Sequence, residues 1–515
     1  MATKYSPLSF SVFSSLLLIL LATTSSSAQA IKAAHGFSSI KEATVHDIQL
    51  AFKQNQLTSR KLVELYLKQI SRLNPVLKGV LEVNPDALYQ ADKADHERKS
   101  KAPGSFSPLH GIPILLKDNI ATKDKLNSTA GSYALLGSVV PRDAGVVTKL
   151  RKAGAIILGK ATLSEWSYYR SNGAPSGWSA RGGQGKSPYT MGYPCGSSSG
   201  SAISVAANMA TVSLGTETDG SILCPSSYNL VVGIKPTVGL TSRAGVIPIS
   251  PRQDTVGTVA DAVYVLDAIV GIDHYDNATI GISQYIPKGG YAQFLKADGL
   301  QAKRVGIVRD PIFNFGNDTI ATQTLDQHLK TLRKKGTILV DNLKLANLVE
   351  IYRSSDEEIA LVAEFKIYIN AYLKELVASP VGSLADLIAF NKKNSKLEML
   401  EEYGQDQFVK AEATNGIGNA EKAALANLAK LTREGFVKLM TKNKLDALVT
   451  PRSSVSHILA IGGFPGVIVP AGYDSDGVPF GLSFGGLKGS EPKLIEIAYG
   501  FEQATKIRKP PKFKF

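Results

Sequence analysis

The stretch PCGSSSGSAISVAANMATVSLGTETDGS, residues 194–221, guides the interpretation of the whole chain. It opens on a Gly/Ser cluster at 196–201, continues through small apolar residues at 202–214, and closes on a second polar loop at 215–221. Glycine and serine let backbone N–H groups approach a reacting atom closely, because no bulky side chain intervenes. Two such loops joined by one buried helix indicate a nucleophile site, although Gly/Ser clusters taken alone are equally typical of turns and linkers.

A second block lies about eighty residues upstream, where 111–119 reads GIPILLKDN. The run 112–116 is short and apolar, which is typical of a buried strand. Lys117 follows directly at the end of this run. Position alone favours a solvent-exposed loop lysine here, so a catalytic interpretation of Lys117 needs further support.

The two blocks together resemble the amidase signature family, whose members use a Ser–cisSer–Lys triad. Residues 196–198 match the start of the family's GGSSGGSA run, and residues 218–221 match its TGGS-type loop. The likeness extends from about Lys41 to Arg508. The spelling GTETDGSILCP is most similar to the branch that contains bacterial peptide amidase and plant amidases.

The resemblance implies a catalytic role for three side chains. Ser221 would be the nucleophile that becomes acylated, and Ser197, after a cis peptide bond, would pass its proton to Lys117. A lysine acts as a base only when it is neutral, so the pKa of Lys117 must fall by about three units from its usual ~10.4. Burial at the end of a strand would supply that shift. No cofactor and no metal ion are implied.

The loop before the nucleophile would supply the oxyanion hole. Its donors would be the backbone N–H groups of Thr218, Asp219, Gly220 and Ser221. Asp219 stands where the family's commoner loop has glycine, so its charge must point away or be compensated. Leu223 replaces an arginine of many members, which puts an anion-binding role at that position in doubt.

We therefore predict a serine amidase that hydrolyses a carboxylic-acid or peptide amide to an acid and ammonia or an amine, through an acyl-enzyme on Ser221. Two alternatives stay open: a glutaminase like the A-type component of the amidotransferases, and a non-catalytic binding protein with the amidase fold. A metal hydrolase is excluded because the chain has no H-E-x-x-H or C-x-x-C pattern.

Composition predicts one large folded domain. Apolar residues make up 44% of the 515 residues and charged residues 20%, a balance typical of a packed globular protein. Predicted strands and helices interleave without a break in composition, so we expect a single α/β domain at 36–508, with a central twisted mixed β-sheet flanked by α-helices, and a basic tail at 509–515. The net charge is +14, but no nucleic-acid-binding motif accompanies it, so we expect an amide substrate and no nucleic acid.

The N-terminal residues 1–30 are typical of a signal peptide. Lys4 precedes an apolar run at 10–22, and the segment ends in the A-x-A pattern of residues 28–30. The run is shorter than the ~20 residues that span a bilayer, so we expect no stable membrane insertion. We predict secretion or an endomembrane lumen.

In the secretory pathway, three sequons could be N-glycosylated, and the state of the two cysteines becomes relevant. The candidate acceptors are Asn127, Asn277 and Asn317. The only two cysteines, Cys195 and Cys224, each lie within three residues of a predicted catalytic serine. We expect buried free thiols at these positions, with a disulfide bond between them as the alternative.

Overall fold

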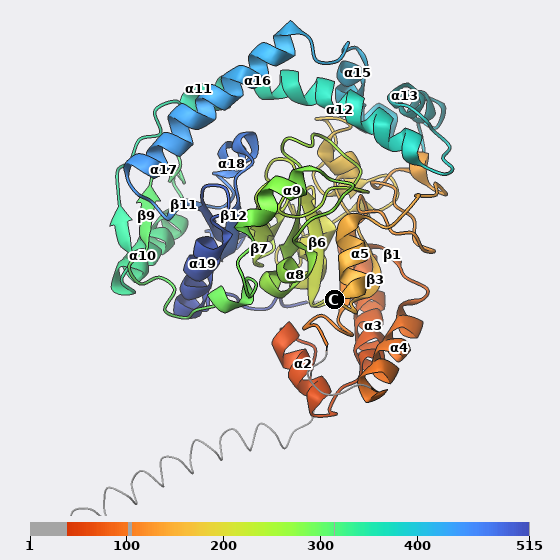
Figure 1. Cartoon of the computed structure of the whole chain (residues 1–515), viewed down its shortest axis with the longest axis horizontal. Helices are drawn as coiled ribbons and strands as arrows, with labels where there is room; N and C mark the ends of the chain where they lie inside the picture. The colour runs from red at the N-terminus through yellow and green to blue at the C-terminus, as the bar shows by residue number, and fades with distance from the viewer. Residues whose placement is uncertain (1–38, 101–105, 314, 514–515) are drawn as a thin grey trace, which may run out of the picture.

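The computed structural model describes residues 39–100, 106–313 and 315–513, so the predicted signal peptide lies outside the described residues. One 11-stranded mixed sheet occupies the centre, with helices packed around it (Figure 1). The strand order is β1-β3-β2-β6-β8-β7-β12-β13-β11-β9-β10. This architecture confirms the predicted α/β fold. No helix of the described residues is long and apolar enough to cross a membrane.

The strands of the sheet are short, and most are buried along their whole length. Their bounds are β1 Val80–Val83, β2 Pro113–Lys117, β3 Ile156–Ala161, β6 Val212–Glu217, β7 Gly233–Lys235, β8 Thr255–Val259, β9 Arg304–Ile307, β10 Ile338–Val340, β11 Ala447–Pro451, β12 Gly466–Tyr473 and β13 Pro479–Gly485. A separate two-stranded sheet pairs β4 Trp178–Ser179 with β5 Gly183–Gln184.

Helices from both halves of the chain surround the sheet. Their bounds are α2 Val45–Lys53, α3 Ser59–Leu77, α4 Ala87–Ser100, α5 Gly145–Lys152, α6 Ser199–Ala206, α7 Leu223–Tyr228, α8 Ala262–Ile269, α9 Ala278–Ile282, α10 Thr319–Lys334 and α19 Glu491–Thr505. Apolar side chains fill one core cluster beside α3 and α5 and another beside α10 and α19. Both clusters lie against the sheet, which is why its strands are almost free of exposed residues.

The remaining helices form an arch along one side of the molecule (Figure 1). Their bounds are α11 Leu348–Arg353, α12 Asp356–Glu375, α13 Leu384–Lys393, α14 Leu400–Tyr403, α15 Asp406–Glu412, α16 Asn419–Thr432, α17 Lys438–Lys442 and α18 Ser456–Gly462. Helices α12 and α16 lie along each other, and α18 packs beneath α16. The arch therefore reaches the sheet through α18.

One local prediction differs from the structure. The apolar stretch 202–214 is not one helix: α6 ends at Ala206, and β6 begins at Val212. Asn208 adopts a left-handed conformation between them (φ 55°), which ends the helix because this conformation cannot continue it. Helix α3 runs to Leu77 with Pro75 inside it, and the Lys78 N–H bonds the Asn74 carbonyl at 2.9 Å, so the helical bonding resumes after the proline.

The parallel centre of the sheet determines where the site forms. Strand β2 pairs in parallel with β3 on one side and with β6 on the other, with Ile114 opposite Val212. The carboxyl ends of parallel strands meet at one edge of a sheet. Lys117, the last residue of β2, and the loop 218–221 that follows β6 therefore lie at the same edge.

Candidate active site

Lys117 and Ser197 are in direct contact inside the protein. Lys117 is fully buried, and its Nζ lies 2.7 Å from Ser197 Oγ and 3.1 Å from the Thr216 carbonyl oxygen. Burial lowers the pKa of Lys117 to about 7, against the opposing charges of Glu217 and Asp254. The expectation of a buried lysine is therefore confirmed, and burial is the cause expected to lower its pKa.

A neutral amine can make both contacts of Lys117. A carbonyl oxygen only accepts, so Nζ donates to Thr216. A neutral amine has one lone pair, which is directed at the other partner when it accepts the Ser197 hydroxyl proton. Lys117 is thereby placed to act as a base toward Ser197.

The Gly196–Ser197 peptide bond is cis, as the resemblance implied. Gly196 leaves no room for a side chain, because a Cβ there would lie 2.2 Å from Ser164 Oγ. On the other side, Ser198 Oγ donates to the Thr216 carbonyl at 3.0 Å and accepts from the Thr216 N–H at 3.2 Å. These contacts hold the serine cluster against the end of β6, beside Lys117.

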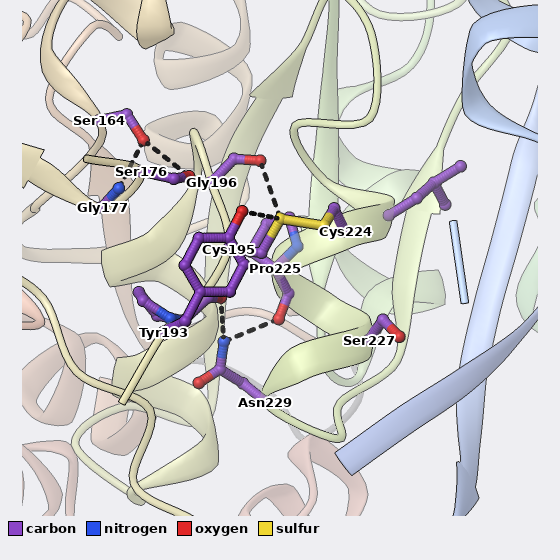
Figure 2. The surroundings of a disulfide bond; sticks show 12 residues. Ser164, Ser176, Gly177, Tyr193, Cys195, Gly196, Cys224, Pro225, Ser227 and Asn229 are labelled. Atoms are coloured by element: carbon purple, nitrogen blue, oxygen red, sulfur yellow. Dashed lines mark hydrogen bonds between the residues drawn. A yellow bond between two sulfur atoms is a disulfide. The ribbon is translucent and has the colours of Figure 1, made fainter. Parts of the chain in front are cut away.

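A disulfide bond joins Cys195 and Cys224, so the expectation of free thiols is wrong (Figure 2). Their Cα atoms are 5.9 Å apart, within the range that a disulfide bridges. The chain leaves the serine cluster along α6, returns along β6 and turns into α7, which brings these two residues together across 29 positions. The bond thus connects the segment before Ser197 to the helix after Ser221.

Ser221 lies at the end of the loop that follows β6, and its side chain is nearly buried (8% exposed). Its backbone carbonyl accepts from the Ser198 N–H at 3.1 Å, which places the two Ser segments side by side. The Ser221 hydroxyl makes no hydrogen bond to any residue that the structure describes. Catalytic hydrogen bonds are often long before substrate binds, and tighten in the substrate complex.

The loop 218–221 presents free backbone donors. Among the described residues, none accepts a hydrogen bond from the N–H groups of Thr218, Asp219, Gly220 or Ser221. Gly220 has a positive φ of 74°, a conformation that glycine adopts without strain. Four consecutive unpaired N–H groups next to a serine hydroxyl can stabilise an oxyanion.

Side chains fix this loop on both sides. Thr218 donates to Asp254 at 2.6 Å, and Asp219 accepts from His457 at 2.9 Å, so the charge of Asp219 is compensated. Glu217 accepts from the N–H groups of Ile222 at 2.6 Å and of the following residue at 2.9 Å. Burial raises the pKa of Glu217, and the nearby Lys235 opposes that rise.

Several of these supporting residues were not predicted from the sequence. Asn119 lies within the upstream block and donates to Thr216 Oγ1 at 2.9 Å and to Ser167 Oγ at 3.2 Å. Its closeness to Lys117 in the sequence could have indicated a role. His457 has no such signal, because it lies 238 positions from Asp219. Leu223 is fully buried in an apolar cluster, so it has no part in anion binding.

The three sequons have different environments. Asn277 and Asn317 are exposed. Asn127 is half-buried, and its amide donates to both carboxylate oxygens of Glu82 at 3.2 Å. In the folded chain, Asn277 and Asn317 are therefore far more accessible to solvent than Asn127.

The chain is similar in sequence to known amidases. The family model described as Amidase matches residues 61–460. A probable amidase of Arabidopsis thaliana is 60% identical over 494 residues, covering 95% of this chain and 94% of the relative. A putative amidase of Schizosaccharomyces pombe is 38% identical over 512 residues, covering 92% of this chain and 87% of the relative.

The fold is also similar to that of solved structures. The native peptide amidase from Stenotrophomonas maltophilia superimposes with a TM-score of 0.85 at 42% identity, covering 92% of this chain and 99% of that chain. Such coverage leaves almost no part of either chain unmatched.

Proposed function

The chain belongs to the amidase family and is a hydrolase of amide C–N bonds, and we propose that Ser221 is its nucleophile, activated by Lys117 through Ser197. The contact of 2.7 Å between Lys117 Nζ and Ser197 Oγ, inside a dry environment, is the observation that carries this proposal. Water does not compete for the lone pair of a buried amine, so the basicity is directed at one hydroxyl.

The proposed reaction begins with proton transfer. Lys117 takes the Ser197 hydroxyl proton while Ser197 takes that of Ser221, and Ser221 Oγ bonds to the amide carbon. The carbonyl oxygen becomes an anion that accepts from the N–H groups of loop 218–221. Ser197 then returns a proton to the nitrogen, the C–N bond breaks, and ammonia or an amine leaves. Water cleaves the resulting ester by the same relay.

A serine-directed fluorophosphonate tests this assignment. The reagent should phosphonylate Ser221 alone, as mapped by mass spectrometry, and Ser221→Ala should abolish both labelling and turnover. Ser227→Ala is a matched control, because this buried serine follows on α7 and is expected to keep labelling intact. Labelling at another serine, or turnover by Ser221→Ala, would overturn the proposal.

We propose an amide of a peptide as the substrate. The peptide amidase from Stenotrophomonas maltophilia supports this choice through its 42% identity and its matching length. The glutaminase alternative is less favoured, because the glutamyl-tRNA(Gln) amidotransferase chain of Thermoanaerobacter pseudethanolicus is only 29% identical. Peptide C-terminal amides, indole-3-acetamide, fatty acid amides and aryl amides should be compared by kcat/KM with wild type and Ser221→Ala. A peptide amide that ranks below the other three would contradict the choice.

We further propose that the protein enters the secretory pathway. The signal-peptide pattern of residues 1–30, the Cys195–Cys224 bond and the exposed acceptors Asn277 and Asn317 support this route, since disulfide bonds persist in oxidising compartments. Expression of the full chain in a eukaryotic secretory host should yield protein cleaved after residue 30. Retention in the cytosol with an intact N-terminus would contradict the route.

A further inference from the structure

A charged cluster supports the oxyanion loop from outside the relay. His457, the second residue of α18, directs Nδ1 at Asp219 of the loop (2.9 Å) and at Glu357 of α12 (3.1 Å). Its Nε2 lies 3.3 Å from the carbonyl oxygen of Ile351, and the ring of Tyr352 stacks on the imidazole with centroids 5.4 Å apart. The cluster thus joins the loop to three helices of the arch.

The partners of His457 require both ring nitrogens to donate. Carboxylates and carbonyl oxygens only accept, and a neutral imidazole has one donor and one acceptor. The ring is therefore an imidazolium, and its charge lies between two carboxylates. Burial opposes this state, but the hydrogen bonds and charges of Asp219 and Glu357 raise the pKa of His457 to about 11.

The same three side chains have the donor types of a metal site. A metal ion would have to displace the Nδ1 proton, which both carboxylates already bind. Metal affinity falls when a ligand holds its proton firmly. The existing hydrogen bonds therefore favour a structural role for the imidazolium over metal binding.

We propose that His457 is a positioning residue of the amidase: it holds Asp219 against Glu357 and thereby fixes the four oxyanion N–H groups of loop 218–221 where the developing anion forms. This inference rests on the proposed function. Asp219 is a member of the loop itself, so anchoring its carboxylate restrains the backbone that carries the adjacent donors. Donors in an oxyanion hole act through fixed orientation, and losing one typically costs about 10²–10³ in rate.

Removing the imidazolium leaves a repulsive pair. The Asp219 and Glu357 carboxylates reach the same nitrogen, and their ligand atoms lie within 4.8 Å of one another. Without the charge between them, like charges at this distance repel each other. His457→Ala should therefore displace the loop, and neutralising the α12 partner by Glu357→Gln should relieve the displacement.

The test compares kinetic constants for a peptide amide. We expect His457→Ala to lower kcat by about 10- to 100-fold with KM within about threefold, and His457→Ala/Glu357→Gln to recover a substantial part of that kcat. His457→Asn keeps one donor toward the carboxylates, so its kcat should lie between those of wild type and His457→Ala. Glu358→Gln changes the exposed neighbour of Glu357 on α12, whose carboxylate pairs with Lys410 at 2.6 Å, so it is the matched control with unchanged kcat.

Inhibition by a peptide aldehyde provides an independent readout. A serine adduct of the aldehyde places an oxyanion in the hole, so its affinity should fall in parallel with kcat/KM across the His457 variants, while a lost structural contact alone would not follow this order. Unchanged kcat in folded His457→Ala and His457→Asn, or no recovery by Glu357→Gln, would overturn the positioning role. Turnover by Ser221→Ala would instead overturn the proposed function.

Discussion

Three lysines at the strand ends of this sheet share one environment and differ in what they contact. Lys117 ends β2, Lys160 lies in β3, and Lys235 ends β7, and all three are fully buried. Burial lowers the pKa of Lys117 to about 7 and those of Lys160 and Lys235 to about 8. A lowered lysine pKa therefore does not by itself identify the base.

The neighbours distinguish the three. Lys160 donates to the Ile120 carbonyl and to Ser128 Oγ, and the charge of Asp118 attracts it. Lys235 donates to the Phe464 carbonyl at 2.7 Å. The charges of Glu217 and Glu491 attract its amine.

Lys117 also lies near carboxylates, but its shortest contact is to the hydroxyl of Ser197. Burial sets the basicity, and the contacted group decides whether that basicity serves chemistry or structure.

Replacing Lys117 with methionine tests the contrast most strongly. We expect kcat to fall by about 10⁴-fold, because general-base catalysis contributes up to that factor. The melting temperature should stay equal or rise, since methionine fills a similar volume without the desolvation cost of a charge. Steady-state kinetics and thermal unfolding measure both. Activity within tenfold of wild type would remove Lys117 from the mechanism.

Lys160→Met should show the opposite pattern. Removing the amine leaves the buried Ile120 carbonyl and Ser128 hydroxyl without their donor and removes the charge that favours ionised Asp118. A buried polar group left without its partner typically costs about 1–3 kcal/mol of stability. Turnover per active site, counted by fluorophosphonate labelling, should stay within about tenfold. Asp118→Asn in the same chain should restore part of the stability. A larger effect on turnover than on urea unfolding would show that Lys160 takes part in catalysis.

The disulfide bond tests whether Ser197 must be held beside Lys117. Cys195→Ser/Cys224→Ser opens a 29-residue loop, and closing loops of this size contributes about 3–4 kcal/mol. We expect a lower melting temperature and a lower kcat, because the bond anchors the segment next to Ser197. Treatment of wild type with a reductant should produce the same shift, whereas the double variant should not respond. Equal melting temperatures for the two proteins would contradict the stabilising role.

The pH dependence tests the basicity of Lys117 itself. Because the amine must be neutral, kcat/KM should rise tenfold per pH unit below about 7 and level off above it. The pKa is lower in the folded than in the unfolded chain, so the folded state binds fewer protons between pH 7 and 10.5. Wild-type stability relative to Lys117→Met should therefore be lowest below pH 7 and increase toward pH 10.5. A falling profile in either quantity would be incompatible with a buried neutral lysine.

Much of the fold could be predicted because its strands are locally distinctive. The apolar run before Lys117 forms β2 as expected. The stretch 202–214 was misassigned because small apolar residues suit a buried helix and a buried strand equally. Only pairing with β2 and β8 makes its second half a strand.

The sequence by itself singled out the three proposed relay residues, since Lys117, Ser197 and Ser221 lie in short blocks whose spelling resembles one family. Tertiary structure alone decided the bond between Cys195 and Cys224 and the contact of Asp219 with His457. A short sequence block shows which residues lie together at one strand end or in one loop. Such a block is enough to predict site residues that are neighbours in the sequence. Contacts across 29 or 238 positions depend on how α6, β6 and the arch pack, and packing is a property of the whole chain.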